Sequence, residues 1–172
     1  MTDAQNASSV LASPAVVRVA EALRAAGVDT QIVELPGAAR TARLAAEFLG
    51  CEVAQIANSL VFRGANTNRP ILVMSSGARR VDTEKLARIA GEPMAKADAE
   101  FVRTATGFAI GGVAPVGHTG AMRAYVERSL SAFGVIWAAA GHPNTVFRLT
   151  YPDLVRITGG AEIDAAAAPV SP

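Results

Sequence analysis

The stretch GFAIGGVAPVGH, residues 107–118, decides how the fold is interpreted. Four glycines and one proline interrupt an apolar run there, and glycine lets another molecule approach the main chain closely. Pro115 fixes its own φ and removes one N–H donor, which stiffens the loop. A stiff glycine-lined loop after a short predicted strand (108–110) is typical of a site that works through main-chain N–H and C=O groups. A structural turn that crosses the core is the alternative, because glycine and proline also mark turns.

The composition indicates one globular domain of 172 residues. Apolar residues make up 51% of the chain, enough for a substantial core, and the formal net charge of +1 gives no bulk electrostatic argument for binding DNA or RNA. No apolar run approaches the roughly 20 residues that cross a bilayer, and no secretory signal is visible. Cys51 is the only cysteine, which excludes an intramolecular disulfide and agrees with a reducing compartment. We therefore expect a cytoplasmic protein without membrane contact.

Capping and turn signals predict helices and strands that interleave without a strict βαβ rhythm. Helices are predicted to start at Ser13-Pro14, Thr41, Asp82 and Asp98, with a further helical turn at 153–157. Strands are predicted at 30–35, 59–62, 71–75, 122–126, 135–139 and 145–149. Residues 1–12 and 161–172 are predicted to be flexible, so that the folded domain spans 13–160. The pattern predicts a single mixed α/β (α+β) domain around a mixed sheet.

Five segments carry a resemblance to one known family. They are, in chain order, TARLAAEFLG (41–50), QIANSLVF (55–62), RRVDTEKLARIAG (79–91), ADAEFVRTATGFAIGGVAPVG (97–117) and AAGHPNTVFRLTYPDLVRITGG (139–160). Together they resemble the YbaK/EbsC family, the free-standing relatives of the editing domain inserted in bacterial prolyl-tRNA synthetase. The resemblance implies a compact domain with a mixed, partly barrel-like sheet flanked by helices.

The resemblance also implies an activity, the hydrolysis of the ester that joins a wrong small amino acid to the 3′ CCA end of a tRNA. In that family a Gly-x-x-x-Pro loop, here 111–115, approaches the ester through its main chain, and a ribose hydroxyl of the terminal adenosine assists. Main-chain groups of Gly111, Gly112 and Val113 would then be catalytic, and Pro115 would stiffen the loop beside the substrate. The implied partners are mischarged tRNA and, as a further candidate, an aminoacyl-tRNA synthetase; no cofactor and no metal ion is implied.

Asn58 departs from the family pattern. Family members that edit usually carry lysine in a run such as QIAKSLVF, and the resemblance implies that its ammonium contacts the phosphate or ribose of the CCA end. Asn58 would then contact the CCA end with an amide that carries no charge. Arg79 or Arg80 would supply the positive charge for a phosphate that Asn58 lacks. The alternative is that the two arginines are a solvated pair before the helix that starts at Asp82. This departure keeps two alternatives open: a paralogue that binds tRNA 3′ ends or a small aminoacyl ligand without turnover, and a hydrolase of another small ester or amide.

Both histidines are candidate substrate-binding residues. His118 follows the glycine-rich loop directly, and an exposed loop histidine is its alternative. His142 and Gly141, in the turn-forming AGHPN, are candidates for the opposite wall of the same pocket. A nucleophilic dyad of Cys51 with a histidine is a weaker alternative, because Cys51 follows a helix end where ordinary packing is expected. No carboxylate stands at a ligand spacing from either histidine, so no metal site is expected. Thr41 is interpreted as a helix cap.

Overall fold

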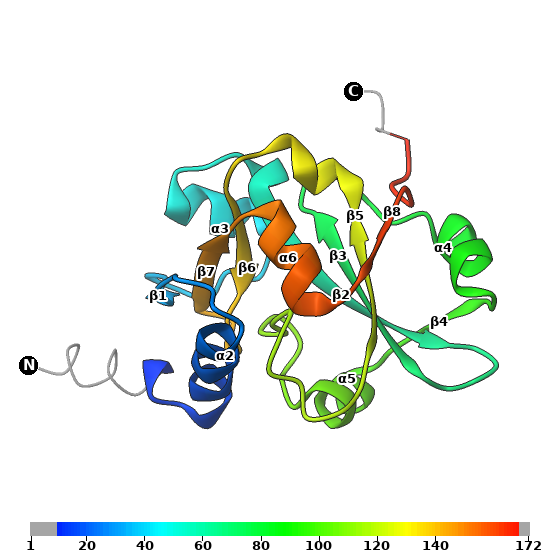
Figure 1. Ribbon diagram of the computed structural model, residues 1–172, viewed down its shortest axis with the longest axis horizontal. Helices are drawn as coiled ribbons and strands as arrows, with labels where there is room; N and C mark the ends of the chain where they lie inside the picture. The colour runs from blue at the N-terminus through cyan, green and yellow to red at the C-terminus, as the bar shows by residue number, and fades with distance from the viewer. Residues whose placement is uncertain (1–9, 169–172) are drawn as a thin grey trace, which may run out of the picture.

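A mixed β-sheet forms the centre of the molecule (Figure 1). The structure, a computed structural model, describes residues 10–168. The strands in this part of the chain are β1 (Val33–Glu34), β2 (Ile56–Gly64), β3 (Pro70–Ser76), β4 (Met94–Lys96), β5 (Arg123–Glu127), β6 (Ile136–Ala139), β7 (Thr145–Leu149) and β8 (Ala161–Ile163). They are ordered β1-β7-β6-β2-β3-β5-β8, and β4 pairs with β2 outside this path. The β2–β6, β3–β5 and β5–β8 pairings are parallel, so the predicted mixed sheet is confirmed.

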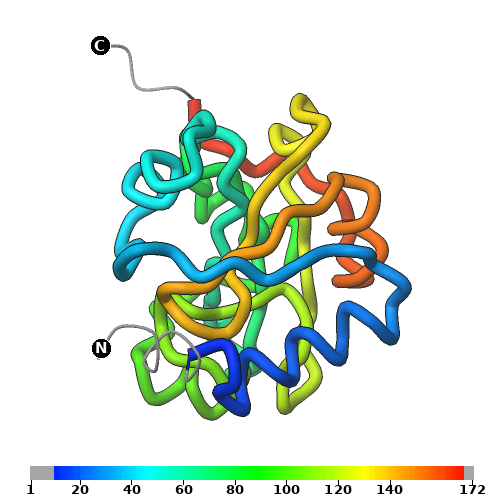
Figure 2. The backbone as a smooth tube through the Cα atoms, turned by 90° about the vertical axis from the view of Figure 1, so that its left-hand side faces the viewer, coloured from blue at the N-terminus to red at the C-terminus, as the bar shows by residue number. Residues whose placement is uncertain are grey.

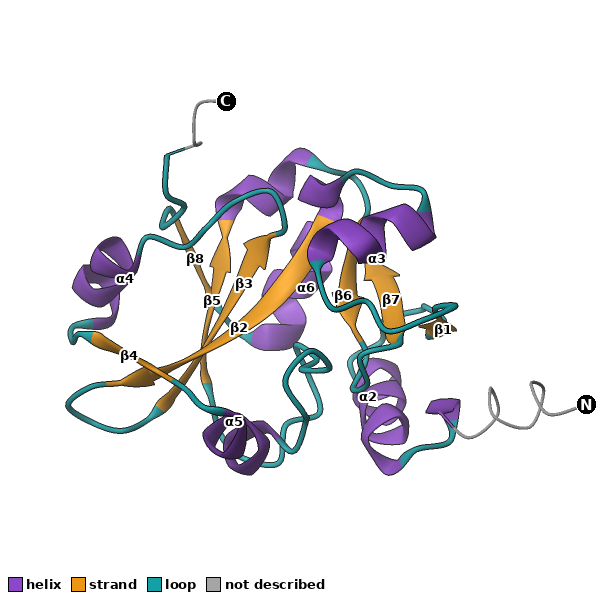
Figure 3. Cartoon of the chain, turned by 180° about the vertical axis from the view of Figure 1, so that it is seen from behind, coloured by secondary structure: helices purple, strands orange, loops and turns teal. Residues whose placement is uncertain are grey.

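Five α-helices cover the two faces of the sheet in the described part of the chain. They are α2 (Pro14–Ala25), α3 (Ala42–Leu49), α4 (Thr83–Ala90), α5 (Ala99–Thr106) and α6 (Tyr151–Thr158), and two short 3-10 helices are η1 (Val53–Gln55) and η2 (Arg128–Ala132). α2, α5 and α6 bury Val19, Val102 and Leu154 in the main core on one face. On the other face Leu86 of α4 and Ala45 of α3 belong to two separate apolar clusters. Seen from behind, α3 lies in front of the sheet and α6 behind it (Figure 3).

The predicted helix starts follow from local side-chain chemistry. Thr41 Oγ1 accepts a hydrogen bond from the N–H of Leu44 at 3.1 Å, at the start of α3. Asp98 Oδ1 accepts from the N–H of Phe101 at 2.8 Å, at the start of α5. Asp82 Oδ1 accepts from two N–H groups in the first turn of α4, at 3.0 and 3.1 Å. Each cap satisfies N–H groups that have no partner inside the helix, and all three predictions are confirmed.

Two predictions about local structure are wrong. Residues 108–110 form no strand, because Phe108 turns into the main core and a turn follows at Ile110 and Gly111. Residues 161–168 are not a flexible tail, since 161–163 form β8 against β5 and the chain continues into an isolated bridge at Ala166. The short strand β4 was not predicted. Residues 1–9 and 169–172, also predicted to be flexible, lie outside the described residues.

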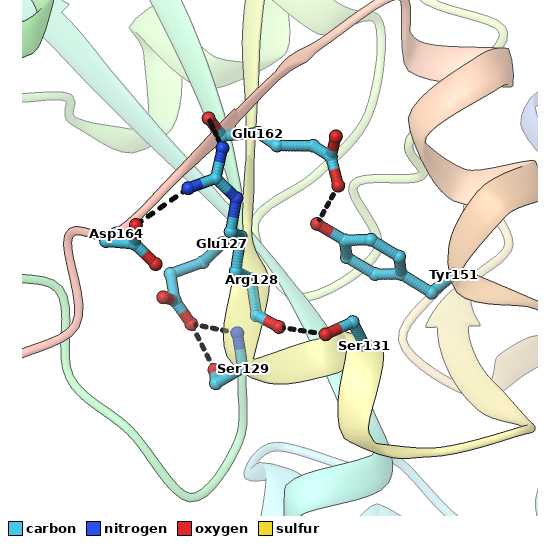
Figure 4. Close-up of polar contacts among 7 residues, drawn as sticks. All are labelled: Glu127, Arg128, Ser129, Ser131, Tyr151, Glu162 and Asp164. Atoms are coloured by element: carbon cyan, nitrogen blue, oxygen red, sulfur yellow. Dashed lines mark hydrogen bonds and ion pairs between the residues drawn. The ribbon is translucent and has the colours of Figure 1, made fainter.

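Polar contacts from two other elements hold β8 in place (Figure 4). The hydroxyl of Tyr151, in α6, donates to Glu162 Oε1 at 2.8 Å, and Arg128, in η2, pairs with Asp164 Oδ2 at 2.8 Å. Burial and the hydrogen bond to Glu162 raise the pKa of Tyr151 well above its usual value, so its hydroxyl remains a donor at neutral pH. Beside them the buried carboxylate of Glu127 accepts hydrogen bonds from the N–H and the hydroxyl of Ser129. β8 is therefore part of the fold.

Removing residues 161–172 is expected to lower the free energy of unfolding by at least about 2 kcal/mol. The truncation deletes Ile163, whose side chain is only 5% exposed in the folded protein. Burial of such a side chain contributes about 1.5–3 kcal/mol. Urea denaturation of the truncated and full-length proteins measures the difference. Removal of 169–172 alone is the control and should leave the free energy unchanged. Equal stability of both truncated proteins would show that β8 contributes nothing.

Candidate active site

A cavity of about 320 Å³ lies in the gap where β2 and β6 diverge. The two strands pair only at Ile56–Trp137 and Ala57–Ala138, after which β6 continues beside β7 and β2 toward β4. The start of α3 closes the gap on one face of the sheet, and the glycine-rich loop after α5 closes it on the other. The wall consists of Ala39, Arg40, Thr41, Ala42, Ala45, Ile56, Ala57, Asn58, Ser59, Leu60, Ile110, Gly111, Val113, Trp137, Ala138, Ala139, Pro143, Thr145 and Val146.

The register of β2 directs main-chain groups of Ser59 into this gap. The N–H of Gly77 donates to the C=O of Ile56 at 2.7 Å, and in an antiparallel ladder such pairs recur at every second residue. Even-numbered residues of β2 therefore bond to β3, and odd-numbered residues point their N–H and C=O to the opposite edge. On that edge Ala57 pairs with β6 and Arg63 with β4. Ser59 lies between these two ladders, so its main chain is open to a ligand.

The glycine-rich loop brings further main-chain donors to the wall. Gly111 has a φ of +89°, a conformation that glycine adopts without strain. Val113 is 4% exposed and lines the cavity. Among the described residues neither the N–H of Gly111 nor that of Val113 has a hydrogen-bond acceptor. Val113 is buried, and a buried N–H without a partner is costly, so an acceptor atom of a bound ligand would be favourable there; Gly111 is exposed at the mouth of the cavity, where water also reaches its N–H.

The side chains of the wall are apolar apart from a few hydroxyls, one amide and one guanidinium. Asn58 is half-buried, and its amide makes no hydrogen bond within residues 10–168. Arg40 is exposed at the rim, directly before the cap of α3. The hydroxyls of Thr41 and Thr145 are already engaged, the first with the N–H of Leu44 and the second with a carbonyl. No aspartate, glutamate, histidine or cysteine lines the cavity in the described part of the chain.

Two predicted substrate-binding residues, Pro115 and His118, lie on the other side of the loop. They line a different cavity, between α2, α6 and the loop, and do not reach the wall of the cavity between β2 and β6. The Nε2–H of His118 donates to the C=O of Ala114 at 2.7 Å, and the ring packs edge-on against Phe108. His118 therefore supports the loop from behind.

The predicted residues Gly112, Gly141 and His142 form the contact between the loop and the turn after β6. A Cβ on Gly112 would lie 2.9 Å from the Cα of His142, so only glycine allows this approach. Gly141 packs in the same way against α2, where a Cβ would lie 2.9 Å from the C=O oxygen of Ala15. None of the three lines the cavity. These contacts hold the loop, the turn after β6 and α2 against one another.

Among the described residues, the positively charged side chain on the wall of the cavity is Arg40. Arg79 and Arg80 are exposed before α4 and do not line the cavity, whereas Arg40 does. Arg40 has no local signal of its own, because its role depends on where α3 packs. Cys51 does not reach the cavity either, and burial raises the pKa of its thiol, so the structure gives no support to a cysteine–histidine dyad. Within residues 10–168 no three histidine, cysteine, aspartate or glutamate side chains are grouped to hold a metal ion.

The fold and the cleft define a class of protein: a single mixed α/β domain with a cavity lined by main-chain groups, one amide and a cation at the rim. The chain belongs to the aminoacyl-tRNA editing domain family, which matches residues 36–157. This result confirms the family resemblance of the sequence. None of the helices in the described residues is both long and apolar enough to span a membrane.

Individual relatives agree with this assignment. The uncharacterized protein YwhH of Bacillus subtilis (strain 168) is 30% identical over 126 residues, which are 73% of this chain and 80% of YwhH. A solved structure of a proposed trans-editing enzyme for prolyl-tRNA synthetase is 42% identical, with a TM-score of 0.85 over 91% of this chain and 99% of that one. The hypothetical protein APE2540 is 26% identical, with a TM-score of 0.81 over 87% of this chain and 99% of that one.

Gly112→Ala is expected to destabilise the protein by about 1–3 kcal/mol, because the added methyl overlaps main-chain atoms of His142 that cannot move independently. Thermal and urea unfolding measure the loss. Gly134→Ala is the matched control, since no atom lies within 4 Å of its added Cβ. A Gly112→Ala protein as stable as the control would contradict the close approach of the loop to the turn.

The stability of the protein is expected to depend on the protonation of His118. Burial holds the pKa of His118 below its usual 6.5, and the nearby charge of Arg18 acts in the same direction. The folded state therefore favours the neutral ring, and this contribution is complete above pH 6.5 and is lost as the pH falls from 6.5 through the lower pKa of the folded state. Urea denaturation between pH 7.5 and 5 should show a smaller pH dependence for His118→Gln than for the wild type. Identical profiles would contradict the shift.

Proposed function

We propose that the protein is a trans-acting aminoacyl-tRNA deacylase that hydrolyses the ester of a mischarged small amino acid. The observation that supports this function most is a cleft where main-chain groups of Gly111, Val113 and Ser59 have no partner, beside the amide of Asn58 and the guanidinium of Arg40. An aminoacyl ester is an activated acyl group, so orientation of water and ester supplies much of the rate without a protein nucleophile. Gly111, Val113 and Ser59 offer the groups that such a site needs.

The N–H groups of Gly111 and Val113 are proposed to stabilise the oxyanion. Attack of water on the ester carbonyl places a negative charge on its oxygen, and fixed donors aimed at that oxygen lower the barrier. Loss of one such donor typically costs a factor of 10²–10³ in kcat. Gly112, between them, fixes the loop against the turn at His142. The water is activated by the adjoining ribose hydroxyl of the substrate, as the family resemblance implies.

Asn58 and Arg40 are proposed to hold the 3′ end of the tRNA. The amide of Asn58 both donates and accepts, which suits a ribose hydroxyl or an ester oxygen. Arg40 is the only charged side chain on the wall within the described residues, and its guanidinium suits the phosphate next to the terminal adenosine. Arg79 and Arg80 remain candidates for phosphates farther along the strand.

The size of the cavity favours a small aminoacyl group. At about 320 Å³ it lies at the lower end of the range of ligand sites, roughly 300–1,000 Å³. Since a relative is a proposed trans-editing enzyme for prolyl-tRNA synthetase, tRNA for proline that carries a wrong amino acid is the first substrate to test. Such a substrate is formed by a synthetase in the cytoplasm, where we place this protein.

Purified protein is expected to release the amino acid from proline tRNA that carries alanine, serine, cysteine or threonine, with one or two of these esters preferred. Loss of radiolabelled ester over time, against a reaction without protein, measures the activity. No hydrolysis of any ester, together with retained tRNA binding, would contradict the deacylase and favour the binding paralogue. Hydrolysis of simple amino acid esters without tRNA dependence would favour a hydrolase of another small ester.

Asn58→Ala is expected to lower kcat/KM by about tenfold or more, and Asn58→Lys to raise it by about tenfold. A hydrogen bond to a charged partner contributes about 1.5–3 kcal/mol, and lysine would add one. Asn66→Ala, in the exposed turn between β2 and β3, is the matched control. Unchanged kcat/KM in both Asn58 variants would remove Asn58 from the site.

A further inference from the structure

Arg18 connects the two ends of the glycine-rich loop. It lies half-buried on α2, and its Nε–H donates to the C=O of Gly117 at 3.1 Å. Its second terminal nitrogen, Nη2, donates to the C=O of Gly107 at 3.1 Å. These carbonyls belong to the first and last glycines of the loop, 89 and 99 residues away along the chain. Figures 1 and 2 show α2 beside this loop.

The loop is shaped to receive the guanidinium. A Cβ on Gly107 would lie 2.7 Å from Nη2 of Arg18, and a Cβ on Gly117 would lie 3.4 Å from the main chain of Arg18. The central carbon of the guanidinium lies 5.0 Å from the centre of the ring of Phe108, which is itself buried in the main core. A cation over an aromatic ring adds to the attraction of the two carbonyls. Glycine at 107 therefore leaves room for the guanidinium, the ring of Phe108 lies against it, and Gly117 lies close to the main chain of α2.

The contacts of Arg18 need the geometry of arginine. The guanidinium is planar and places several donors in fixed directions, whereas lysine offers one nitrogen at the end of a flexible stem. No carboxylate within residues 10–168 forms an ion pair with Arg18; the partners of its guanidinium are the two carbonyls and the ring of Phe108. A half-buried charge with these partners indicates a specific structural task rather than a solvated surface position.

We propose that Arg18 is a positioning residue that fixes the loop so that the N–H groups of Gly111 and Val113 point to the substrate. Arg18 does not line the cavity, so it acts through the loop. Both ends of the loop are tied to one rigid helix, and the two donors lie between the ties. The catalytic part of this proposal rests on the proposed deacylase function, and the structural part does not.

The structural part is tested by hydrogen–deuterium exchange of the loop in Arg18→Ala, Arg18→Lys and wild-type protein. The N–H of Thr119 donates to the C=O of Thr106 at the base of the loop, the N–H of Gly112 donates to the C=O of Ala109 within it, and both should exchange slowly in the wild type. Both Arg18 variants are expected to exchange at least tenfold faster across 107–119. Arg24→Ala, an exposed arginine on the same helix, is the matched control and should leave the loop unchanged. Equal exchange in the wild type and both Arg18 variants would overturn the proposal.

The catalytic part is tested by steady-state deacylation. Arg18→Lys keeps the charge and much of the stem, so it remains informative if Arg18→Ala is poorly folded. We expect kcat to fall about 10- to 100-fold, since small displacements of catalytic groups have such effects, while KM stays within twofold. A merely stabilising residue would lower the melting temperature and leave kcat unchanged below it, and that result would overturn the positioning role. If the wild type hydrolyses no ester, the proposed function fails, and the exchange experiment still decides whether Arg18 holds the loop.

Discussion

β2 pairs with different strands along one edge, and these ladders do not meet. The parallel ladder with β6 ends at Ala57, and the antiparallel ladder with β4 begins at Phe62. Between them the N–H and C=O of Ser59 have no strand partner, although unpaired main-chain groups are costly when they are buried. A ligand that supplies a donor and an acceptor would remove this cost. The cavity thus forms because β2 pairs with β6 near its start and with β4 near its end, and with neither strand at Ser59.

The walls of the cavity are supported from outside it. Gly112 touches the main chain of His142, Gly141 touches the start of α2, and Arg18 ties both ends of the loop to the same helix. These contacts join segments that are far apart in the sequence, so the loop is held by the tertiary structure as well as by its own hydrogen bonds. Glycine recurs here because main chain packs against main chain, and a methyl group would separate the segments.

The sequence predicted those features whose causes are local. The caps at Thr41, Asp82 and Asp98 need only side chains within one helical turn, and they form as predicted. β8 could not be predicted, because its pairing with β5 and its contacts to η2 and α6 involve partners that the segment itself does not indicate. The candidate site follows the same division: the loop stands out by its own residues, and Asn58 by its place in the family resemblance. The placement of Arg40 at the cavity and of His118 behind the loop depends on packing that no short motif describes.

A wall whose only charged side chain is Arg40 has consequences for the chemistry that the cleft can perform. Ester hydrolysis moves a proton from water to the leaving oxygen, and no carboxylate or imidazole of the described residues lies on the wall to carry it. In the proposed reaction the proton would then pass between groups of the substrate and water, and the protein would orient these groups and stabilise the oxyanion. Such stabilisation depends on donors that are fixed before the reaction begins. In the proposed mechanism the residues behind the loop, Arg18 through its bonds to both loop ends and His118 through its bond to Ala114, contribute by keeping those donors in place.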